Sequence, residues 1–359
     1  MINSIQLENF KIFKEKTVFP LSNINLLTGV NGRGKSSFLQ SILLFKQTLD
    51  NENKLLKRLI LNGECVQLGT FDDIMNATIT KESNIGITFN YDNISYPFSL
   101  IQDKKDDMIA KIQKGSLSKI SFLKNLHYIA ADRVGPQQFY LRNTLPSFLS
   151  VGTKGEYIGN VLYQKRDDIV HESLYLGNLK SEELIIQAGE WLGKILDTEG
   201  LKIQVKEVGN GVIILSFQFG ISEKEYKPSN VGFGYSFILP IVVTGLIAKK
   251  GETIIIENPE AHLHPKAQSN LVEFLAKISK CGIQIFIESH SEHILNALRV
   301  CVSRDEPIIN STDVSVLFFK DDDKSRFDQI TIESDGSIDN WPDNFFDQTK
   351  IDLQKILNF

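Results

Sequence analysis

Residues 29–36 read Gly29-Val30-Asn31-Gly32-Arg33-Gly34-Lys35-Ser36, which fits the phosphate-binding pattern G-x-x-x-x-G-K-[ST]. An apolar, strand-like stretch at residues 24–27 leads into this loop. A segment with the apolar spacing of a helix, residues 38–43, leads out of it. A strand, a glycine-rich loop and a helix in this order are the context that the pattern requires. The sequence therefore predicts a loop that wraps around the phosphates of a nucleotide.

Each residue type in this loop suits phosphate binding. Glycines let backbone N–H groups turn inward around phosphate oxygens, and the positive end of the following helix adds to the attraction. We expect Lys35 to reach the β- and γ-phosphates of ATP and the Ser36 hydroxyl to hold Mg²⁺. The expected nucleotide contacts are Asn31, Gly32, Arg33, Gly34, Lys35, Ser36 and Ser37. The alternative is a glycine-rich turn that matches by chance, and the flanking strand and helix disfavour it.

Composition limits the classes of protein to consider. The chain has 359 residues, enough for two domains or for one α/β core with a large insertion. Its hydrophobic content of 42% is typical of a packed core. A net charge of -5 gives no general sign of a nucleic-acid binder. The basic run at residues 54–58 is more typical of a solvated helix face, although it leaves a local contact with nucleic acid open.

The cysteines and the apolar stretches predict the compartment. Cys65, Cys281 and Cys301 are far apart and form no C-x-x-C pair, which favours a reducing environment. The longest apolar stretch, residues 237–248, contains Pro240 and Gly245 and is too short to cross a bilayer. We therefore expect a cytoplasmic protein with no signal peptide and no membrane contact.

Apolar periodicity predicts the order of strands and helices. The first hundred residues favour strands with one helix over 41–60, and residues 84–91 and 94–100 alternate as a hairpin does. Helical segments and loops are expected from 102 to 198, with the clearest helix over 181–196 and Ser181 as its N-cap. Further along we expect a hairpin at 202–208 and 212–219, a helix at 235–248, strands at 253–257 and 284–288, helices at 266–280 and 292–302, a β-pair at 314–319 and 329–332, and a short final helix.

The predicted strand at 253–257 supplies the second half of an ATPase site. A P-loop ATPase needs a carboxylate at the end of a neighbouring strand to hold the Mg²⁺ shell. Thr253-Ile254-Ile255-Ile256-Glu257 is an apolar strand that ends in such a carboxylate. Its presence makes a chance match of the phosphate loop less credible.

Here the sequence resembles a known family. Ile255-Ile256-Glu257-Asn258-Pro259-Glu260-Ala261-His262-Leu263-His264-Pro265 resembles the Walker B and D-loop region of ABC-type ATPases, most closely the OLD-like and SMC-like branch with its D-E-P-E-x-x-L-H-P version. Residues 229–236, Ser-Asn-Val-Gly-Phe-Gly-Tyr-Ser, stand where that branch carries its signature. Residues 286–291, Phe-Ile-Glu-Ser-His-Ser, resemble the switch-histidine loop, and residues 7–11 resemble the family's N-terminal opening.

Two further segments are similar to a narrower bacterial group. They are residues 128–136 and residues 339–347. The group comprises the "AAA family ATPases" of antiphage defence operons, including the ATPase of Septu-type systems. This resemblance implies a separate effector protein, a nuclease, that the ATPase senses or regulates.

The resemblance implies an α/β fold: an ABC-type P-loop ATPase head with a mixed-sheet core, an N-terminal antiparallel β part and a mostly helical insertion. The expected parts are residues 1–101 with Walker A, the insertion at 102–198, residues 199–312 with the signature, Walker B and switch histidine, and a β-pair and helix at 313–359. The insertion is the expected docking surface for the effector.

The resemblance also implies an assembly. In this class the phosphate loop of one subunit and the signature of its partner enclose ATP, so we expect a head-to-tail homodimer or a higher oligomer. Ser229, Gly232 and Gly234 would then act in trans on the nucleotide. Gln67 matches the Q-loop glutamine that senses Mg²⁺, and an ordinary loop glutamine is an equal alternative. The expected metal contacts are Ser36, Gln67 and Glu257.

One departure from the family concerns catalysis. Active relatives carry a glutamate directly after the Walker B carboxylate, whereas this chain has Asn258. An amide orients water but cannot accept its proton, so we expect slow ATP hydrolysis, with Glu260 as the alternative base. The expected catalytic set is Glu257, Asn258, Glu260 and His290, where His290 contacts the γ-phosphate.

Several alternatives stay open. The pairs His262/His264 and His290/His293 have the spacing of a metal-dependent hydrolase, and Asp321-Asp322-Asp323 is either a ligand set or a solvated turn. Arg133 is either a phosphate or interface arginine or part of a surface ion pair, and Ser289-x-x-Glu292 reads as a helix capping box. A self-contained OLD-like DNA nuclease and a DNA-repair ATPase are the alternative functions. The short tail after the last motif disfavours the former, and the missing coiled-coil arms disfavour the latter.

Overall fold

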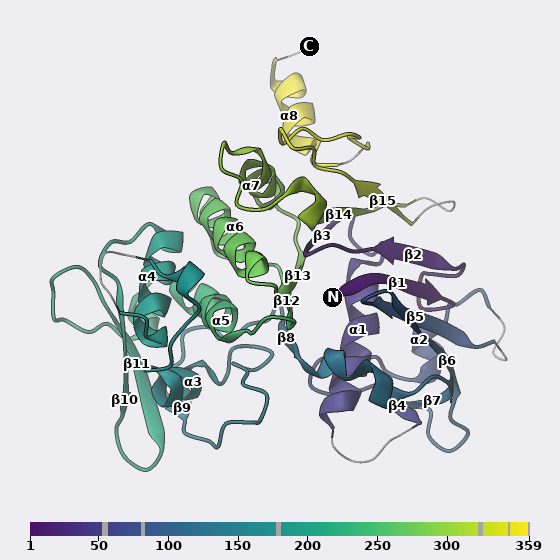
Figure 1. The fold of residues 1–359 in the computed structure, drawn as a ribbon, viewed down its shortest axis with the longest axis horizontal. Helices are drawn as coiled ribbons and strands as arrows, with labels where there is room; N and C mark the ends of the chain where they lie inside the picture. The colour runs from purple at the N-terminus through teal and green to yellow at the C-terminus, as the bar shows by residue number, and fades with distance from the viewer. Residues whose placement is uncertain (52–56, 80–82, 177–180, 322–325, 344, 358–359) are drawn as a thin grey trace. The chain divides into compact units, whose positions relative to one another are not determined.

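The chain forms two compact units in the computed structural model, which describes residues 1–51, 57–79, 83–176, 181–321, 326–343 and 345–357 (Figure 1). Unit 1 comprises Met1–Lys124 and Asn310–Phe359, and unit 2 comprises Asn125–Ile309. These bounds differ from the four parts expected from the sequence, because residues 102–198 contribute a strand to the sheet of unit 1 and another to the sheet of unit 2. No helix in the described ranges is long and apolar enough to cross a membrane.

Unit 1 contains an antiparallel sheet that carries its apolar residues on alternate positions. Its strands are, in spatial order, β2 (Thr17–Pro20), β1 (Ile2–Glu8), β5 (Ile85–Tyr91), β6 (Ile94–Gln102), β7 (Ile109–Lys114) and β4 (Arg58–Ile60). β5 buries Ile85, Ile87 and Phe89, as the period-two pattern predicts. The predicted hairpin of β5 and β6 is confirmed, and its turn residues Asp92 and Asn93 have positive φ angles of 47° and 64°, which suit a tight two-residue turn.

The helix expected over 41–60 is corrected by the structure. Helix α1 (Lys35–Asp50) begins earlier and ends at Asp50, and Arg58–Ile60 forms strand β4 instead. β4 pairs with β7, and two side chains of α1 satisfy its backbone: Gln47 donates to the Ile60 carbonyl and Thr48 accepts from the Ile60 N–H. Long-range pairing therefore outweighs local helix propensity here. Lys54 of the basic run lies outside the described residues.

Strands from both ends of the chain meet in unit 1. β3 (Ile24–Gly29) runs parallel to β14 (Val314–Phe319), which pairs antiparallel with β15 (Phe327–Ile330). β3 and β14 are almost entirely buried, as expected for strands of a central parallel sheet. The short helix α2 (Phe71–Ile74) and the C-terminal helix α8 (Gln348–Leu357) complete the unit, and α8 agrees with the predicted final helix.

Unit 2 is built on parallel strands. β12 (Thr253–Glu257) lies between β8 (Leu126–Ile129) and β13 (Gln284–Glu288) and is parallel to both. Helix α6 (Pro265–Lys280) connects β12 to β13, and α7 (Glu292–Ser303) follows (Figure 1). The predicted βαβ unit is confirmed almost to the residue. β8 was not predicted from the sequence.

The rest of unit 2 mixes helices with a small antiparallel sheet. The sheet has the order β10 (Lys202–Glu207), β11 (Val212–Gln218), β9 (Tyr140–Leu141), and its first two strands are the predicted hairpin. The helices are α3 (Ile158–Lys165), α4 (Leu184–Leu196) and α5 (Phe233–Ile247). Short 3₁₀ turns occur at Leu117–Lys124 in unit 1, Glu172–Leu174 and Pro228–Asn230 in unit 2, and Ser311–Asp313 in unit 1.

Two expectations for residues 102–198 need correction. The segment contains the strands β7, β8 and β9 besides α3 and α4, so strands that were not predicted accompany the predicted helical segments and loops. Ser181 is not the N-cap of α4, because the helix begins at Leu184 and Glu183 is its N-cap residue. Glu183 instead forms a β-bridge with Ile169, which holds the preceding backbone extended.

Candidate nucleotide-binding site

The phosphate loop joins β3 to α1 in unit 1 and depends on glycine at two positions. Gly29 has φ 120°, and a Cβ atom there would lie 2.1 Å from the Phe319 carbonyl oxygen. Gly34 has φ 109°, and a Cβ atom there would lie 2.7 Å from side-chain atoms of Ile12 and Phe13. No other residue type fits these positions without strain. The glycines of the pattern are thus required by backbone conformation and by close packing.

Lys35 is the first residue of α1, and its ammonium group folds over the loop. Its Nζ atom donates to the carbonyl oxygens of Gly29 and Val30 at 2.9 and 3.0 Å, and the residue is only 4% exposed. Gly34, the N-cap, has no side chain to cap the helix, and the first turn carries no acidic residue. Asn31, Gly32 and Ser36 are exposed, and Ser37 is half-buried. A buried cation, a helix N-terminus and a hydroxyl at one loop fit the triphosphate and Mg²⁺ of ATP.

Two other predicted residues of unit 1 have local partners. Arg33 forms a 2.6 Å ion pair with Asp321, and both side chains are partly exposed. Asp322 and Asp323, the rest of the acidic triplet, lie outside the described residues. Gln67 is exposed and donates to the Gly63 carbonyl oxygen at 2.7 Å. Its role toward Mg²⁺ stays a prediction.

Glu257 ends β12 in unit 2, as predicted, and its carboxylate is largely withdrawn from water. Burial raises its pKa above the ordinary value, while hydrogen bonds from the Tyr128 hydroxyl and the Ala131 N–H oppose that rise. The Ala131 N–H lies 3.3 Å from Oε2. An oxygen ligand in this setting suits a divalent cation, because the cation restores the charged form.

Asn258 follows in the left-handed region, with φ 43°. Its N–H donates to the Glu288 carbonyl oxygen at 2.8 Å, so the turn after β12 is joined to the end of β13. The guanidinium of Arg133 donates to the carbonyl oxygens of Glu257 and Asn258, both at 2.8 Å. Arg133 is 4% exposed, so the alternative of a surface ion pair is wrong, and a role toward phosphate or at an interface stays a prediction. Sequence reasoning missed its contacts with this turn, and no local signal marks them.

Glu260 and His290 are brought together within unit 2. Glu260 Oε1 accepts a hydrogen bond from the His290 backbone N–H at 2.9 Å. His290 itself is exposed at the loop after β13. The predicted capping box at Ser289 is wrong, since Ser291 is the N-cap of α7 and its hydroxyl accepts from the His293 N–H. Ser289 is fully buried and accepts from the Ser291 N–H.

The histidine pairs do not assemble a metal centre in the described part of the chain. His264 is the N-cap of α6, where its Nδ1 accepts from the Lys266 N–H at 3.3 Å. The ring of His262 packs against that of Phe237, with centroids 4.6 Å apart. Among the described residues no group of three or more His, Cys, Asp or Glu side chains is placed to hold a metal ion. The metal-dependent hydrolase interpretation has no support there.

The signature residues surround the N-terminus of α5. Gly232 is the N-cap and Gly234 lies in the first turn, while Ser229 belongs to the preceding 3₁₀ turn. Ser229 and Gly232 are exposed, and Phe233 beside them is 54% exposed. No described side chain caps this helix end, and its first turn carries no acidic residue. The arrangement is a second exposed helix N-terminus that suits an anion.

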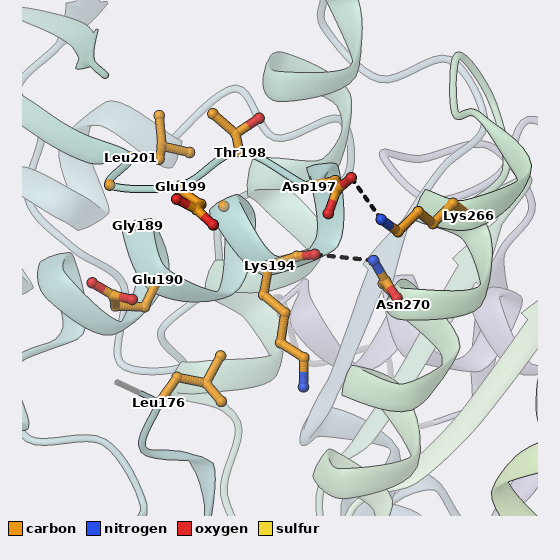
Figure 2. Close-up of a pocket in the computed structure, with 12 residues that line it drawn as sticks. Leu176, Gly189, Glu190, Lys194, Asp197, Thr198, Glu199, Leu201, Lys266 and Asn270 are labelled. Atoms are coloured by element: carbon orange, nitrogen blue, oxygen red, sulfur yellow. Dashed lines mark hydrogen bonds and ion pairs between the residues drawn. The ribbon is translucent and has the colours of Figure 1, made fainter. Parts of the chain in front are cut away.

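Unit 2 also holds a cavity that contains none of the predicted site residues. It measures about 490 Å³ and lies between the C-terminal half of α4 and the start of α6. Figure 2 shows Asp197 and Lys266 pointing toward one another, 2.6 Å apart, and Asn270 donating to the Lys194 carbonyl oxygen at 3.0 Å.

Comparison with solved structures defines the class. The SmcHead bound to the C-winged helix domain of ScpA superposes with a TM-score of 0.56, over 92% of this chain and 98% of that chain, at 12% identity. The protein thus has an SMC-head-like α/β fold with a mixed parallel sheet and antiparallel sheets, as expected from the ABC-type resemblance.

The family follows from the sequence comparisons. The AAA ATPase domain family matches residues 1–147 and 164–295, so the chain belongs to that family and uses ATP with Mg²⁺ as its members do. A second family, described as protein of unknown function (DUF3696), matches residues 309–356. The Old nuclease of Escherichia phage P2 is 36% identical over 72 residues, a match that spans 18% of this chain and 12% of the nuclease. The similarity to OLD proteins is therefore distant and partial.

Proposed function

We propose that this ATPase is a nucleotide-operated switch whose ATP-bound form is a head-to-tail dimer, and that the dimer regulates a separate effector nuclease in bacterial antiphage defence. The observation that carries the proposal is the exposed, uncapped N-terminus of α5 with Ser229 and Gly232 at its surface. The free N–H groups of this helix end can act on ATP only when a phosphate group binds there. In the proposed dimer, the phosphate belongs to ATP held by the loop of the partner subunit.

The proposed roles follow the chemistry of each group. Lys35 binds the β- and γ-phosphates, and Ser36, Gln67 and Glu257 hold Mg²⁺ directly or through water. The metal, when bound, neutralises charge on the phosphate oxygens. Asn258 orients the attacking water, and His290 contacts the γ-phosphate. Since an amide cannot take the proton from water, hydrolysis is slow. The presence of ATP therefore mainly determines whether the protein is in its dimeric state.

The assignment of an effector is supported by similarity at residues 128–136 and 339–347 to the ATPases of Septu-type operons. In the proposal, ATP holds the nuclease restrained, and its depletion or hydrolysis releases it. The docking surface is proposed to lie within the predicted insertion, residues 102–198, of which residues 125–198 belong to unit 2.

The test compares nucleotide binding with assembly. Isothermal titration and light scattering would be run on wild type, Lys35→Ala and Ser229→Arg with ATP, ADP or no nucleotide. We expect a dimer with ATP only. Lys35→Ala should lose ATP binding, whereas Ser229→Arg should bind ATP and stay monomeric. Ser222→Arg, on an exposed loop outside the signature, is the matched control and should dimerise. Equal ATP affinity for Lys35→Ala and wild type would refute the site.

A second assay separates the switch from the alternative of a self-contained OLD-like DNA nuclease. The isolated chain would be incubated with DNA and Mg²⁺ or Mn²⁺, and the product of the adjacent gene would be tested for copurification. We expect no cleavage by the chain alone and copurification of the neighbour. Robust cleavage that survives Lys35→Ala but not the change of Asp321 and Asp322 to alanine would favour the nuclease.

A further inference from the structure

Arg133 is a buried arginine in the loop after β8, within the segment 128–136 but outside the phosphate loop, the signature, Walker B and the switch-histidine loop. Its Nη1 atom donates to the carbonyl oxygens of Ala130 and Glu257 at 3.0 and 2.8 Å, and its Nη2 atom donates to that of Asn258 at 2.8 Å. The two carbonyls after β12 belong to the peptide groups on either side of Asn258. The planar fork of the guanidinium therefore holds the backbone of the residue proposed to orient the attacking water.

That backbone requires external support. Asn258 has φ 43°, and the next residue, Pro259, disfavours helical conformations for the residue before it. A strained backbone of this kind persists only when its surroundings over-determine it. The Asn258 N–H is fixed to Glu288 of β13, and Arg133 fixes the carbonyl groups. Together these contacts fix the backbone from which the Glu257 and Asn258 side chains project.

Burying the charged guanidinium of Arg133 costs free energy, so a specific role is expected to offset that cost. Burial lowers the pKa of Arg133 to about 10, and the nearby carboxylates of Glu260 and Glu257 oppose that change. The guanidinium is thus charged at neutral pH, while its buried Nε has no hydrogen-bond partner in the described residues. Packed apolar side chains would serve stability as well as such a buried charge does. A cation here gives the turn a fixed geometry that apolar packing would not give.

Arg133 also touches the signature helix. Its guanidinium carbon lies 5.5 Å from the centre of the Phe237 ring on α5. Phe237 in turn packs edge-on against His262 in the turn before α6, with centroids 4.6 Å apart. One ring on α5, a turn after the signature glycines, therefore contacts both Arg133 and the D-loop. A movement of this helix end within unit 2 would reach the Glu257–Asn258 turn through Arg133.

Resting on the function proposed above, we propose that Arg133 is a positioning residue for ATP hydrolysis: it holds the turn that carries Glu257 and Asn258 and couples it to the signature helix through Phe237. ATP binding by the phosphate loop does not depend on it. Removing the guanidinium should therefore slow the hydrolysis step and raise the Mg²⁺ concentration needed for half-maximal rate. The affinity for ATP should stay the same.

The test compares Arg133→Met and Arg133→Lys with wild type in the full chain. Methionine keeps apolar volume and removes the donors, whereas lysine keeps the charge without the fork. Arg142→Met is the matched control. Arg142 pairs with Glu207 at 2.9 Å and lies 5.6 Å from the centre of the Tyr163 ring, and its contacts among the described residues include no motif residue. The measurements are ATP affinity by titration, single-turnover hydrolysis, the Mg²⁺ concentration for half-maximal rate, and thermal unfolding.

We expect Arg133→Met to bind ATP like wild type, to hydrolyse it roughly tenfold or more slowly, and to need more Mg²⁺. Arg133→Lys should fall between the two, and Arg142→Met should match wild type. If Arg133→Met does not fold, Phe237→Leu replaces it, since it removes the ring but keeps a branched apolar side chain. It should slow single turnover in the same direction without changing affinity.

Wild-type turnover in a folded Arg133→Met would overturn the proposal. A loss of ATP affinity in parallel with turnover would overturn it too, because it would indicate a merely structural role. Failure of the wild type to bind ATP would instead refute the proposed function, and is seen before any variant is compared.

Discussion

Glu260 and His290 are joined by a hydrogen bond: Oε1 of the carboxylate accepts from the His290 backbone N–H at 2.9 Å. Glu260 lies in the turn after β12, and His290 lies in the loop after β13, the neighbouring parallel strand. The second oxygen, Oε2, is buried and has no partner in the described residues. This hydrogen bond joins the D-loop, through Glu260, to the switch loop, through His290.

This contact leads to a prediction about the catalytic base. Glutamine at position 260 keeps an oxygen acceptor for the His290 N–H but has no carboxylate to take a proton. We expect Glu260→Gln to retain most of the phosphate release of wild type and Glu260→Ala to lose much of it, measured at steady state. If Glu260→Gln instead releases no phosphate, the carboxylate itself is required, and Glu260 is the catalytic base.

A second prediction concerns Asn258, whose positive φ suits asparagine and glycine better than glutamate. We expect Asn258→Glu to raise ATP turnover, because it restores a carboxylate beside the water, and to lower the free energy of unfolding by about 1 kcal/mol. Asn258→Gly is the control: it keeps the backbone conformation, removes the amide and should lower turnover without loss of stability. Unchanged turnover in Asn258→Glu would show that the water lies elsewhere.

The glycines of the phosphate loop allow a third prediction. Gly34→Ala places a Cβ atom 2.7 Å from Ile12 and Phe13 at a positive φ, so we expect it to lose about 1–3 kcal/mol of unfolding free energy together with ATP affinity. Gly32→Ala also has a positive φ, but a Cβ atom there meets no atom of the described residues within 4 Å. It should lose about 1 kcal/mol or less. Equal losses measured by denaturant unfolding would contradict the packing argument.

A fourth prediction follows from the raised pKa of Glu257, caused first by burial. A carboxyl whose pKa is higher in the folded state favours folding below its unfolded pKa, and this contribution is lost as pH rises through the folded pKa. The ionised side chain therefore lowers stability at neutral pH. We expect Glu257→Gln to be more stable than wild type at about pH 7, with the difference shrinking toward about pH 5.

Glu273 is the control of opposite sign for this prediction. Burial acts to raise its pKa, but hydrogen bonds from Lys194 and Arg304 outweigh burial and lower it. Its contribution to stability is present above the unfolded pKa and is lost as pH falls through the folded pKa. Glu273→Gln should therefore be less stable than wild type at neutral pH. Parallel behaviour of the two variants in urea titrations would refute the sign assigned to Glu257.

The last prediction concerns the switch. If His290 reads the γ-phosphate, His290→Ala should weaken the ATP-bound dimer more than any ADP-bound dimer, as measured by light scattering with each nucleotide. His293→Ala is the matched control, because His293 is also exposed and lies three residues further along. A uniform loss of assembly with both nucleotides would assign His290 a structural role.

Local signals in the sequence determined the phosphate loop, the βαβ unit from Thr253 to Glu288, and the strand end that presents Glu257. Each is set by residues close in the chain, because glycine conformation and apolar periodicity act over a few positions. Tertiary structure alone decided that Arg58–Ile60 is a strand and that Ser291, not Ser289, caps α7. It also decided the place of Arg133, whose hydrogen bonds reach carbonyl groups 124 and 125 positions away. Such contacts form only when β8 lies beside β12, and no periodicity within the chain encodes that pairing.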